Sequence, residues 1–244
     1  MEAKSVDMVM VIVSRKRAQM LSQKSAKFFP SAKICIAFEE VDEYLEYFPE
    51  SRLVGHPNDI VGTGPVRQWV LDNFKNNIVV MIDDDIDVCY SQVGFKKRRI
   101  EDWRTIEALV ERTAIAAKDS GARFFGYAVG SIPFSYEPFD PFSLCTWSDG
   151  VIGIIGKEVR YDTNLKLRED VDFALKTLQK DRYVFIDTRF LFSHDRFTAS
   201  GGNSAVRTES RHEQEMLHLK KKWKNHIKIK KVKGTYKTTL NVER

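Results

Sequence analysis

Aspartates that follow an apolar run are the feature of this sequence that most directly indicates chemistry. The run Ile78–Ile82 leads into four carboxylates within five residues, at Asp83, Asp84, Asp85 and Asp87. Such a cluster repels itself unless a cation neutralises it, and carboxylate oxygens suit Mg²⁺ or Mn²⁺. Because alternate residues of an extended chain point the same way, Asp83 and Asp85 would share one face. We therefore expect a divalent metal site here; the alternative is an acidic turn that only ends the strand.

A metal held by a strand-end Asp-x-Asp pattern predicts chemistry on a diphosphate, such as phosphoryl, nucleotidyl or glycosyl transfer. The chain contains no phosphate-binding loop of the GxxxxGKS or GxxxxGKT type, which argues against a P-loop nucleotide hydrolase. Gly62-Thr63-Gly64 is too short to hold phosphate groups by itself.

Basic residues near the end of the first predicted strand form a second group of interest. Ser14, Arg15 and Arg17 follow the run Met8–Val13, and Arg67 lies in the helical segment before the aspartates. Guanidinium groups and a hydroxyl at such a place could bind phosphate or the edge of a nucleotide base. We assign these four residues to donor binding; the alternative for each basic residue is a solvated surface charge.

Short apolar runs that alternate with segments of helical period predict an α/β fold, with a mostly parallel sheet between layers of helices. The expected strands are Met8–Val13, Ile34–Phe38, Ile78–Ile82, Phe124–Val129, Val151–Ile155 and Tyr183–Ile186. The expected helices are Arg17–Phe28, Gly64–Phe74, Trp103–Ser120 and Arg168–Lys180. Ligands of such sheets bind beyond the carboxyl ends of the strands, where the aspartates are expected. The stretch Ile132–Ser148 predicts a long excursion or a strand pair at the sheet edge.

The size and composition of the chain predict one main domain with a small appendage. The chain has 244 residues, 43% of them hydrophobic, which is enough to bury a core without disulfides. Cys35, Cys89 and Cys145 form no CxxC pair, so neither a disulfide framework nor a zinc site is indicated. The N-terminus lacks the pattern of a signal peptide or membrane anchor. We expect a protein of the reducing cytoplasm.

Positive charge is concentrated at the C-terminal end of the chain. Residues 205–244 carry 12 Lys and Arg against 4 Asp and Glu, a net of +8, whereas residues 1–204 carry −3. We therefore divide the chain into a main domain, 1–204, and a basic extension, 205–244, packed on it. Residues 208–224 predict a helix with an apolar stripe of Met216, Leu217, Leu219 and Trp223. The next segment, HIKIKKVKG, alternates Ile with Lys, as in a strand with one lysine face.

A basic extension of this kind predicts binding to a polyanion, and nucleic acid is the favoured partner. The lysines assigned to this contact are Lys220, Lys221, Lys222, Lys224, Lys228, Lys230 and Lys231. Trp223 and Tyr236 could stack on a base. The alternatives are a merely solvated tail, and membrane headgroups, which the narrow apolar stripe disfavours. We expect no stable membrane association and no obligate protein partner.

An ordered set of motifs along the chain resembles a known enzyme family. It comprises Ser14-Arg15-x-Arg17, Gly64-Pro65-Val66-Arg67, Asp83-Asp84-Asp85 and Arg168-Glu169-Asp170. The set is similar to that of GT-A glycosyltransferases and, more narrowly, of the TET-associated glycosyltransferases of bacteriophages, which modify hydroxymethylated bases in DNA. The resemblance covers roughly residues 7–204 and implies the GT-A form of the Rossmann-like fold.

The resemblance implies a role for each residue on the donor side. Asp85 would bind the metal, Asp83 would contact the donor ribose or the metal through water, and Asp84 would also contact the donor. His194, after a late strand, would be a further metal ligand; the alternative is a purely structural histidine. Gly201 and Gly202 could let a loop close its amides over the diphosphate.

On the acceptor side, the resemblance assigns the role of base to Asp170, with Glu169 as the alternative. An acid in the first turn of a helix also serves as a cap, and the two roles are compatible. If the enzyme retains anomeric configuration, Asp170 only positions the acceptor. Trp147 and Asp149 would meet the acceptor, with plain core packing as the alternative for Trp147.

We therefore expect a metal-dependent glycosyltransferase that uses Mn²⁺ or Mg²⁺. It would move a sugar from UDP-glucose or a similar UDP-sugar to a 5-hydroxymethylated pyrimidine, such as 5-hydroxymethylcytosine, in phage DNA. The base would be flipped out of the duplex, in the cytoplasm of an infected bacterium. The alternatives are a metal-dependent nucleotidyltransferase or nuclease, and a non-catalytic nucleic-acid-binding module.

Overall fold

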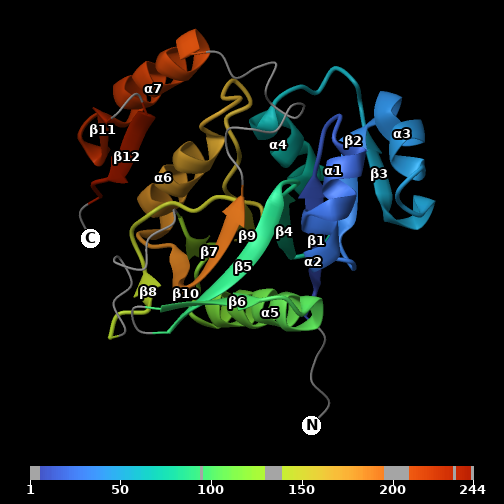
Figure 1. Ribbon diagram of the computed structural model, residues 1–244. Helices are drawn as coiled ribbons and strands as arrows, with labels where there is room; N and C mark the ends of the chain where they lie inside the picture. The colour runs from blue at the N-terminus through green and yellow to red at the C-terminus, as the bar shows by residue number, and fades with distance from the viewer. Residues whose placement is uncertain (1–5, 94–95, 130–138, 195–208, 233–234, 243–244) are drawn as a thin grey trace.

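The computed structural model describes residues 6–93, 96–129, 139–194, 209–232 and 235–242 of the chain. Within these residues, ten strands form one sheet in the order β3-β2-β1-β4-β9-β7-β10-β5-β6, and β8 pairs with β10. Helices cover both faces of this sheet (Figure 1). The predicted α/β fold with a mixed, mostly parallel sheet is therefore confirmed.

The N-terminal part of the chain builds a parallel half-sheet. Its strands are β1 (Met8–Val13), β2 (Lys33–Ala37), β3 (Leu53–His56) and β4 (Ile78–Asp83), connected through α1 (Ala18–Gln23), α2 (Ser25–Phe28), α3 (Val41–Leu45) and α4 (Thr63–Asn73). Short 3₁₀ turns cover Phe38–Glu40 and Glu50–Arg52. Side chains of β4 alternate between the faces, so Met81 packs in the cluster under α4 and Ile82 in the cluster on the opposite face.

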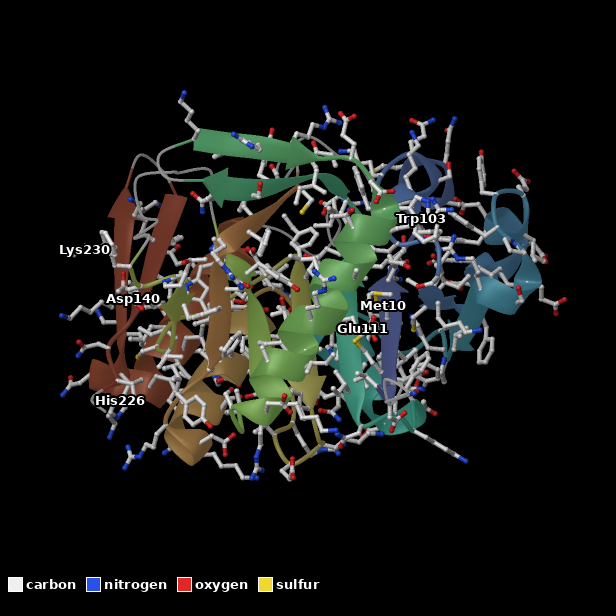
Figure 2. The ribbon with its side chains drawn as sticks, turned by 90° about the horizontal axis from the view of Figure 1, so that it is seen from below. Met10, Trp103, Glu111, Asp140, His226 and Lys230 are labelled. Carbon is white, nitrogen blue, oxygen red and sulfur yellow. The ribbon has the colours of Figure 1, made fainter. Side chains whose placement is uncertain are left out.

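The rest of the sheet mixes strand directions. It contains β5 (Ile86–Val93), β6 (Lys96–Ile100), β7 (Phe124–Ala128), β8 (Phe142–Ser143), β9 (Val151–Ile155) and β10 (Phe185–His194), with α5 (Trp103–Asp119) and α6 (Glu169–Asp181) on opposite faces. Figure 2 shows α5 lying across the sheet, with Trp103 at its first turn.

Strand β9 departs from the parallel direction expected of most strands, because it runs antiparallel to both β4 and β7. β9 enters the sheet at the edge where the aspartates lie, since the amide of Asp83 donates to the carbonyl of Gly150, and it must therefore run back from that edge. β10 continues past its predicted end at Ile186 because its second half pairs with β5. The helix expected over Arg17–Phe28 is two helices, which break at Lys24.

The C-terminal extension consists of α7 (Glu209–Trp223), a 3₁₀ turn (Lys224–His226) and a hairpin of β11 (Ile227–Val232) and β12 (Thr235–Leu240). Met216, Leu219 and Trp223 are buried in the same apolar cluster as interior residues of α4 and α6. Leu217, which we also expected in this stripe, is 62% exposed because it is turned about 100° from Met216. Among the described residues, no helix is both long and apolar enough to cross a lipid bilayer.

Leu219→Ala should destabilise the protein, because this fully buried side chain fills the contact between α7 and the main domain. The free energy of unfolding should fall by about 2–5 kcal/mol, the usual range for a leucine cavity. Leu217→Ala, the matched control on the exposed side of the same helix, should change it by less than about 0.5 kcal/mol. Urea titration followed by circular dichroism measures both, and equal losses would contradict this packing.

Candidate active site

The predicted aspartates form the end of β4 and the turn into β5. Val13 of β1 pairs with Asp83, so the residues that follow both strands emerge at one edge of the sheet. The amide of Asp83 donates to the Gly150 carbonyl (2.8 Å), and its carbonyl accepts from Ser25 Oγ (2.6 Å). Ser25 Oγ also accepts from the amide of Ile86 (2.8 Å). The backbone of the turn is thus fixed on both sides.

Asp84 points into the protein and is 6% exposed. Its Oδ2 accepts from Ser14 Oγ (2.8 Å), and its Oδ1 accepts from Arg17 Nη1 (2.9 Å). Because Ser14 gives its one proton to Asp84, the Tyr44 hydroxyl 2.7 Å away donates to Ser14. Burial raises the pKa of Asp84, whereas Arg17 and Ser14 act to lower it. The structure therefore corrects the donor-binding assignment of Asp84: this residue anchors the turn, with Ser14 and Arg17 as its partners.

Asp83 and Asp85 are the more accessible carboxylates, with side chains 31% and 13% exposed. Nη1 of Arg17 lies 3.9 Å from Oδ2 of Asp85. The two carboxylates fit Mg²⁺ or Mn²⁺, which prefer oxygen ligands and keep bound water. The described side chains include no group of three His, Cys, Asp or Glu that could hold a metal. Further ligands would therefore come from water, a diphosphate or a residue outside that part of the chain.

The remaining predicted donor-side residues are His194, Gly201, Gly202 and Arg15. The backbone of His194, at the end of β10, pairs with Ile86, the residue after Asp85, so the register brings this position beside the aspartate turn. The side chain of His194 and the residues Gly201 and Gly202 lie outside the described part of the chain. Arg15 is 30% exposed, and its Nε lies 3.7 Å from Oε1 of Glu40.

Arg67 joins the aspartate turn to helix α6. Its side chain is 3% exposed, and it donates from Nη2 to Asp83 Oδ1 (2.6 Å) and from Nη1 to Glu169 Oε1 (3.0 Å). Burial acts to lower the pKa of Arg67, but the two carboxylates together outweigh burial and raise it. The guanidinium therefore stays charged and fixes the distance between the turn and the start of α6.

Glu169 and Asp170 open helix α6 and are 4% and 9% exposed. Oδ1 of Asp170 accepts from the amide of Val171 (2.7 Å), as expected of an acid at a helix N-terminus. Burial raises the pKa of Glu169, the charge of Asp170 adds to this, and Arg67 opposes it. Burial is also the largest effect on Asp170, whose pKa it raises, and the charge of Asp149 adds to it. Carboxyl groups with raised pKa values are suited to proton transfer near neutral pH.

Trp147 contacts the C-terminal extension. Its Nε1 donates to the carbonyl of Thr238 in β12 (3.4 Å), and its ring packs on the apolar cluster shared with α6. The structure therefore favours the packing alternative for Trp147 over acceptor binding. Asp149 is half-buried and directly precedes Gly150, whose carbonyl accepts from the amide of Asp83, so it lies at the same edge of the sheet as the aspartates.

Most of the predicted nucleic-acid-binding lysines extend from the surface of α7 and the hairpin. Exposed residues are Lys220, Lys221, Lys224, Lys228, Lys230 and Lys231, and Figure 2 shows Lys230 at the outer margin of the molecule. Lys222 differs, because its Nζ lies 2.8 Å from both Asp162 Oδ2 and Asp172 Oδ1. The structure therefore reassigns Lys222 to holding α7 on the main domain.

The two aromatic residues expected to stack on a base are engaged within the protein. Trp223 is 7% exposed and donates to Asp172 Oδ1 (2.7 Å), so it is a packing residue. The ring of Tyr236 lies 5.2 Å from that of His212, and Lys231 Nζ lies 5.4 Å from the Tyr236 ring centre.

Three residues that shape this site carry no signal in the sequence. Ser25 and Tyr44 hold the aspartate turn, as described above, and Glu215 of α7 accepts from the amides of Lys166 and Leu167 just before α6. Each is an ordinary polar residue in a helix, and only the tertiary fold brings it to the site.

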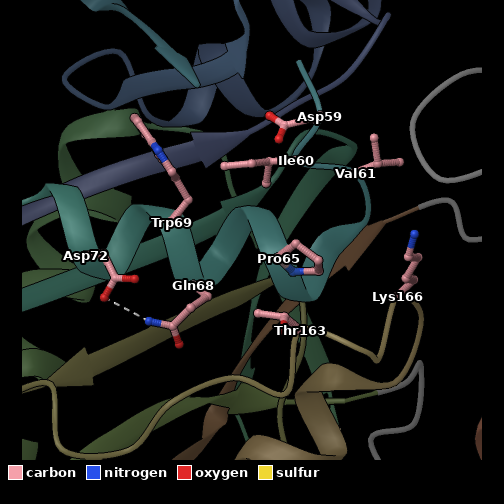
Figure 3. Close-up of a pocket in the computed structure, with 9 residues that line it drawn as sticks. All are labelled: Asp59, Ile60, Val61, Pro65, Gln68, Trp69, Asp72, Thr163 and Lys166. Atoms are coloured by element: carbon pink, nitrogen blue, oxygen red, sulfur yellow. Dashed lines mark hydrogen bonds between the residues drawn. The ribbon is translucent and has the colours of Figure 1, made fainter. Parts of the chain in front are cut away.

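A shallow cavity of about 390 Å³ runs along α4 (Figure 3). It is lined by Asp59, Ile60, Val61, Pro65, Gln68, Trp69, Asp72, Thr163 and Lys166. Within it, Gln68 Nε2 donates to Asp72 Oδ1 (3.0 Å), so part of its polar lining is paired internally. These lining residues include none of the predicted donor, metal or acceptor residues, and we do not assign this cavity to the site.

The sequence matches the family described as TET-Associated Glycosyltransferase over residues 8–202. The chain belongs to the TET-associated glycosyltransferase family. S. aureus TarS 1-349, solved in complex with UDP-GlcNAc, aligns with a TM-score of 0.52 and 10% identity, covering 89% of this chain and 66% of the TarS chain. The mannosyltransferase PcManGT from Pyrobaculum calidifontis, solved with GDP-Man and Mn2+, aligns with a TM-score of 0.49 and 10% identity, covering 76% and 55%. No curated protein matches the chain.

The TarS alignment concerns the fold, which resembles that of GT-A glycosyltransferases as predicted. This TET-associated glycosyltransferase spans less than two thirds of the TarS and PcManGT chains.

The stability of this glycosyltransferase should fall as pH rises through the neutral range. Burial raises the pKa of Glu169 from 4.5 to about 8. The protonated Glu169 side chain therefore contributes fully to stability below the pKa of the unfolded chain, and this contribution is lost as pH rises through the pKa of the folded protein. Glu169→Gln keeps an oxygen for Arg67 but cannot ionise. Its unfolding free energy should depend less on pH across that window, by up to about 1.4 kcal/mol per pH unit. Urea titrations in EDTA measure this, and parallel pH profiles for the two proteins would contradict a raised pKa.

Proposed function

We propose that this protein transfers a sugar from a nucleotide-sugar to a hydroxymethylated pyrimidine base in DNA. The family match supports glycosyl transfer, and the UDP-GlcNAc bound to TarS favours a UDP-sugar as donor. The observation that carries the proposal is the pairing of Arg67 with both Asp83 and Glu169. This pairing joins an accessible acidic turn, suited to a metal and a diphosphate, to a buried acid pair suited to proton transfer.

On the donor side, we propose that Asp83 and Asp85 hold Mn²⁺ or Mg²⁺, with His194 as a further ligand. The metal would supply positive charge to the diphosphate leaving group. Arg17 and Arg67 already contact the aspartates, so their guanidinium groups would lie next to the phosphates of a donor bound there. Arg15, which is partly exposed, is the remaining basic residue proposed for donor contact.

On the acceptor side, Asp170 takes the proton of the acceptor hydroxyl on a carboxylate oxygen if the reaction inverts anomeric configuration, with Glu169 as the alternative. Burial raises the pKa of Asp170, which supports this role because a carboxylate with a raised pKa is a stronger base than a free one. If the reaction retains configuration, Asp170 positions the acceptor instead. Asp149, at the same edge, is the proposed acceptor contact.

The exposed lysines of the extension support DNA as the acceptor. Each lysine that displaces a counterion from a phosphate contributes salt-dependent affinity. The TET association in the family's description supports a hydroxymethylated base as the modified group. Such a base would have to leave the helical stack to meet Asp170.

Asp85→Ala should reduce metal-stimulated transfer at least about 100-fold, because it removes a ligand of the ion that stabilises the leaving group. Asp87→Ala is the matched control, since Asp87 belongs to the same acidic stretch but is exposed in β5, and it should keep close to the wild-type rate. The assay follows labelled sugar from a panel of nucleotide-sugars into hydroxymethylated DNA, with and without Mn²⁺. Full Mn²⁺-stimulated transfer by Asp85→Ala would refute the metal assignment, and strand scission without a donor would favour a nuclease.

Lys228→Glu combined with Lys230→Glu should weaken binding to duplex DNA at all sequences. Both lysines are exposed on β11, and the loss of two phosphate contacts should reduce the slope of log Kd against log salt by about 2. Lys75→Glu with Lys118→Glu, exposed lysines elsewhere on the protein, is the charge-matched control. Fluorescence anisotropy over a range of salt concentrations measures the slopes. Equal slopes for both double variants would rule out this face as the DNA contact.

A further inference from the structure

The C-terminal extension contacts the segment that carries the proposed base. Residues 166–172 include the end of a loop and the first turn of α6, with Glu169 and Asp170 at its centre. Helix α7 bonds to this segment before and within its helical turn. The family match ends at residue 202, so α7 lies beyond the matched region.

Glu215 is the central contact between α7 and this segment. Its side chain is 8% exposed, its Oε1 accepts from the amide of Lys166 (3.1 Å), and its Oε2 accepts from the amide of Leu167 (3.0 Å). Hydrogen bonds from backbone amides to a carboxylate are stronger than those to a neutral acceptor. A carboxylate that accepts from two consecutive amides fixes the plane and position of the backbone between them.

The start of α6 has no side-chain cap of its own. Arg168 occupies the N-cap position, and its side chain makes no capping hydrogen bond. A helix that begins without a cap leaves amides unpaired at its start and frays more easily. Glu215 does not cap these amides; it fixes the two residues that precede Arg168 and so holds the chain where it enters the helix.

Three further contacts of α7 flank Glu215. Arg168 Nη2 lies 2.6 Å from Nε2 of His212, and because arginine can only donate, the histidine nitrogen accepts. One turn into α6, Asp172 Oδ1 accepts from Trp223 Nε1 (2.7 Å) and lies 2.8 Å from Lys222 Nζ. The segment that holds Glu169 and Asp170 is therefore held to α7 at both of its ends.

We propose that Glu215 is a positioning residue for sugar transfer: it holds residues 166–168 so that Asp170 faces the acceptor while Glu169 remains on Arg67. This rests on the proposed function, in which Asp170 acts on the acceptor hydroxyl. Glu215 bonds to the amides of Lys166 and Leu167, neither of which is proposed to bind the donor or the metal. Its loss should therefore lower kcat and leave the donor KM unchanged, because a displaced base slows the chemical step only.

The test compares Glu215→Ala, Glu215→Gln and the control Gln214→Ala, an exposed neighbour on α7, in the whole 244-residue chain. Glu215→Ala should lower kcat about 10- to 100-fold with the donor KM within about twofold of wild type. Glu215→Gln keeps one oxygen acceptor and should recover part of this loss, and Gln214→Ala should behave as wild type. In an Asp170→Asn background, Glu215→Ala should cause no further loss, since the residue it positions no longer acts as a base.

Amide hydrogen exchange measured by NMR tests the contact without reference to catalysis. The amides of Lys166 and Leu167 should exchange faster in Glu215→Ala, while those of the sheet stay protected. Faster exchange with an unchanged kcat would overturn the positioning role. A kcat loss that is explained by the fraction of unfolded protein would also overturn it. So would a Glu215→Ala loss of kcat that is as large in the Asp170→Asn background as in the wild type. A wild-type protein that transfers no sugar would overturn the proposed function instead, and the contact itself would then be judged by amide exchange.

Discussion

The buried guanidinium of Arg67 is the interaction on which the rest of the site depends. It binds Asp83 at the end of β4 and Glu169, 102 residues away, at the start of α6. A buried charge is tolerated only when paired, and removing one partner of such a pair costs about 3–5 kcal/mol. Gly64 permits the close approach of α4 to the loop that precedes α6, since a Cβ at this position would lie 2.3 Å from the Leu165 carbonyl oxygen. Burial raises the pKa of Glu169, and the charges of Asp170 and Asp83 add to this rise; the same negative charge favours a divalent cation.

The family region and the C-terminal extension pack on each other through a shared apolar cluster. The matched residues 8–202 supply the sheet, the aspartate turn and the acid pair. The extension adds a helix whose inner side contacts the start of α6 through Glu215 and Trp223. Exposed lysines lie on the outside of the same extension. The proposed DNA-binding lysines on the outside and the position of the acid pair on the inside are thus linked through one helix.

The sequence predicts well the elements that depend on a local residue pattern. It predicts poorly the roles of side chains that depend on how distant elements pack together. Continuous apolar runs specify buried strands, so Met8–Val13 and Val151–Ile155 have the predicted bounds. β5 and β6 were not predicted, because a segment such as Lys96–Ile100 lacks apolar alternation and is a strand only through its pairing at the sheet edge. Trp147, Lys222 and Trp223 resemble surface-binding residues in the sequence, and their structural roles follow from the way α7 and β12 pack on the main domain.

Anomalous diffraction from a crystal grown with Mn²⁺ and a UDP-sugar tests most directly whether the aspartate turn binds a metal together with the diphosphate of the donor. We predict one manganese peak bound by carboxylate oxygens of Asp83 and Asp85 and by the donor's phosphates, with Arg67 still paired to Glu169. A bound donor whose diphosphate lies elsewhere, or a manganese peak away from both aspartates, would contradict this assignment.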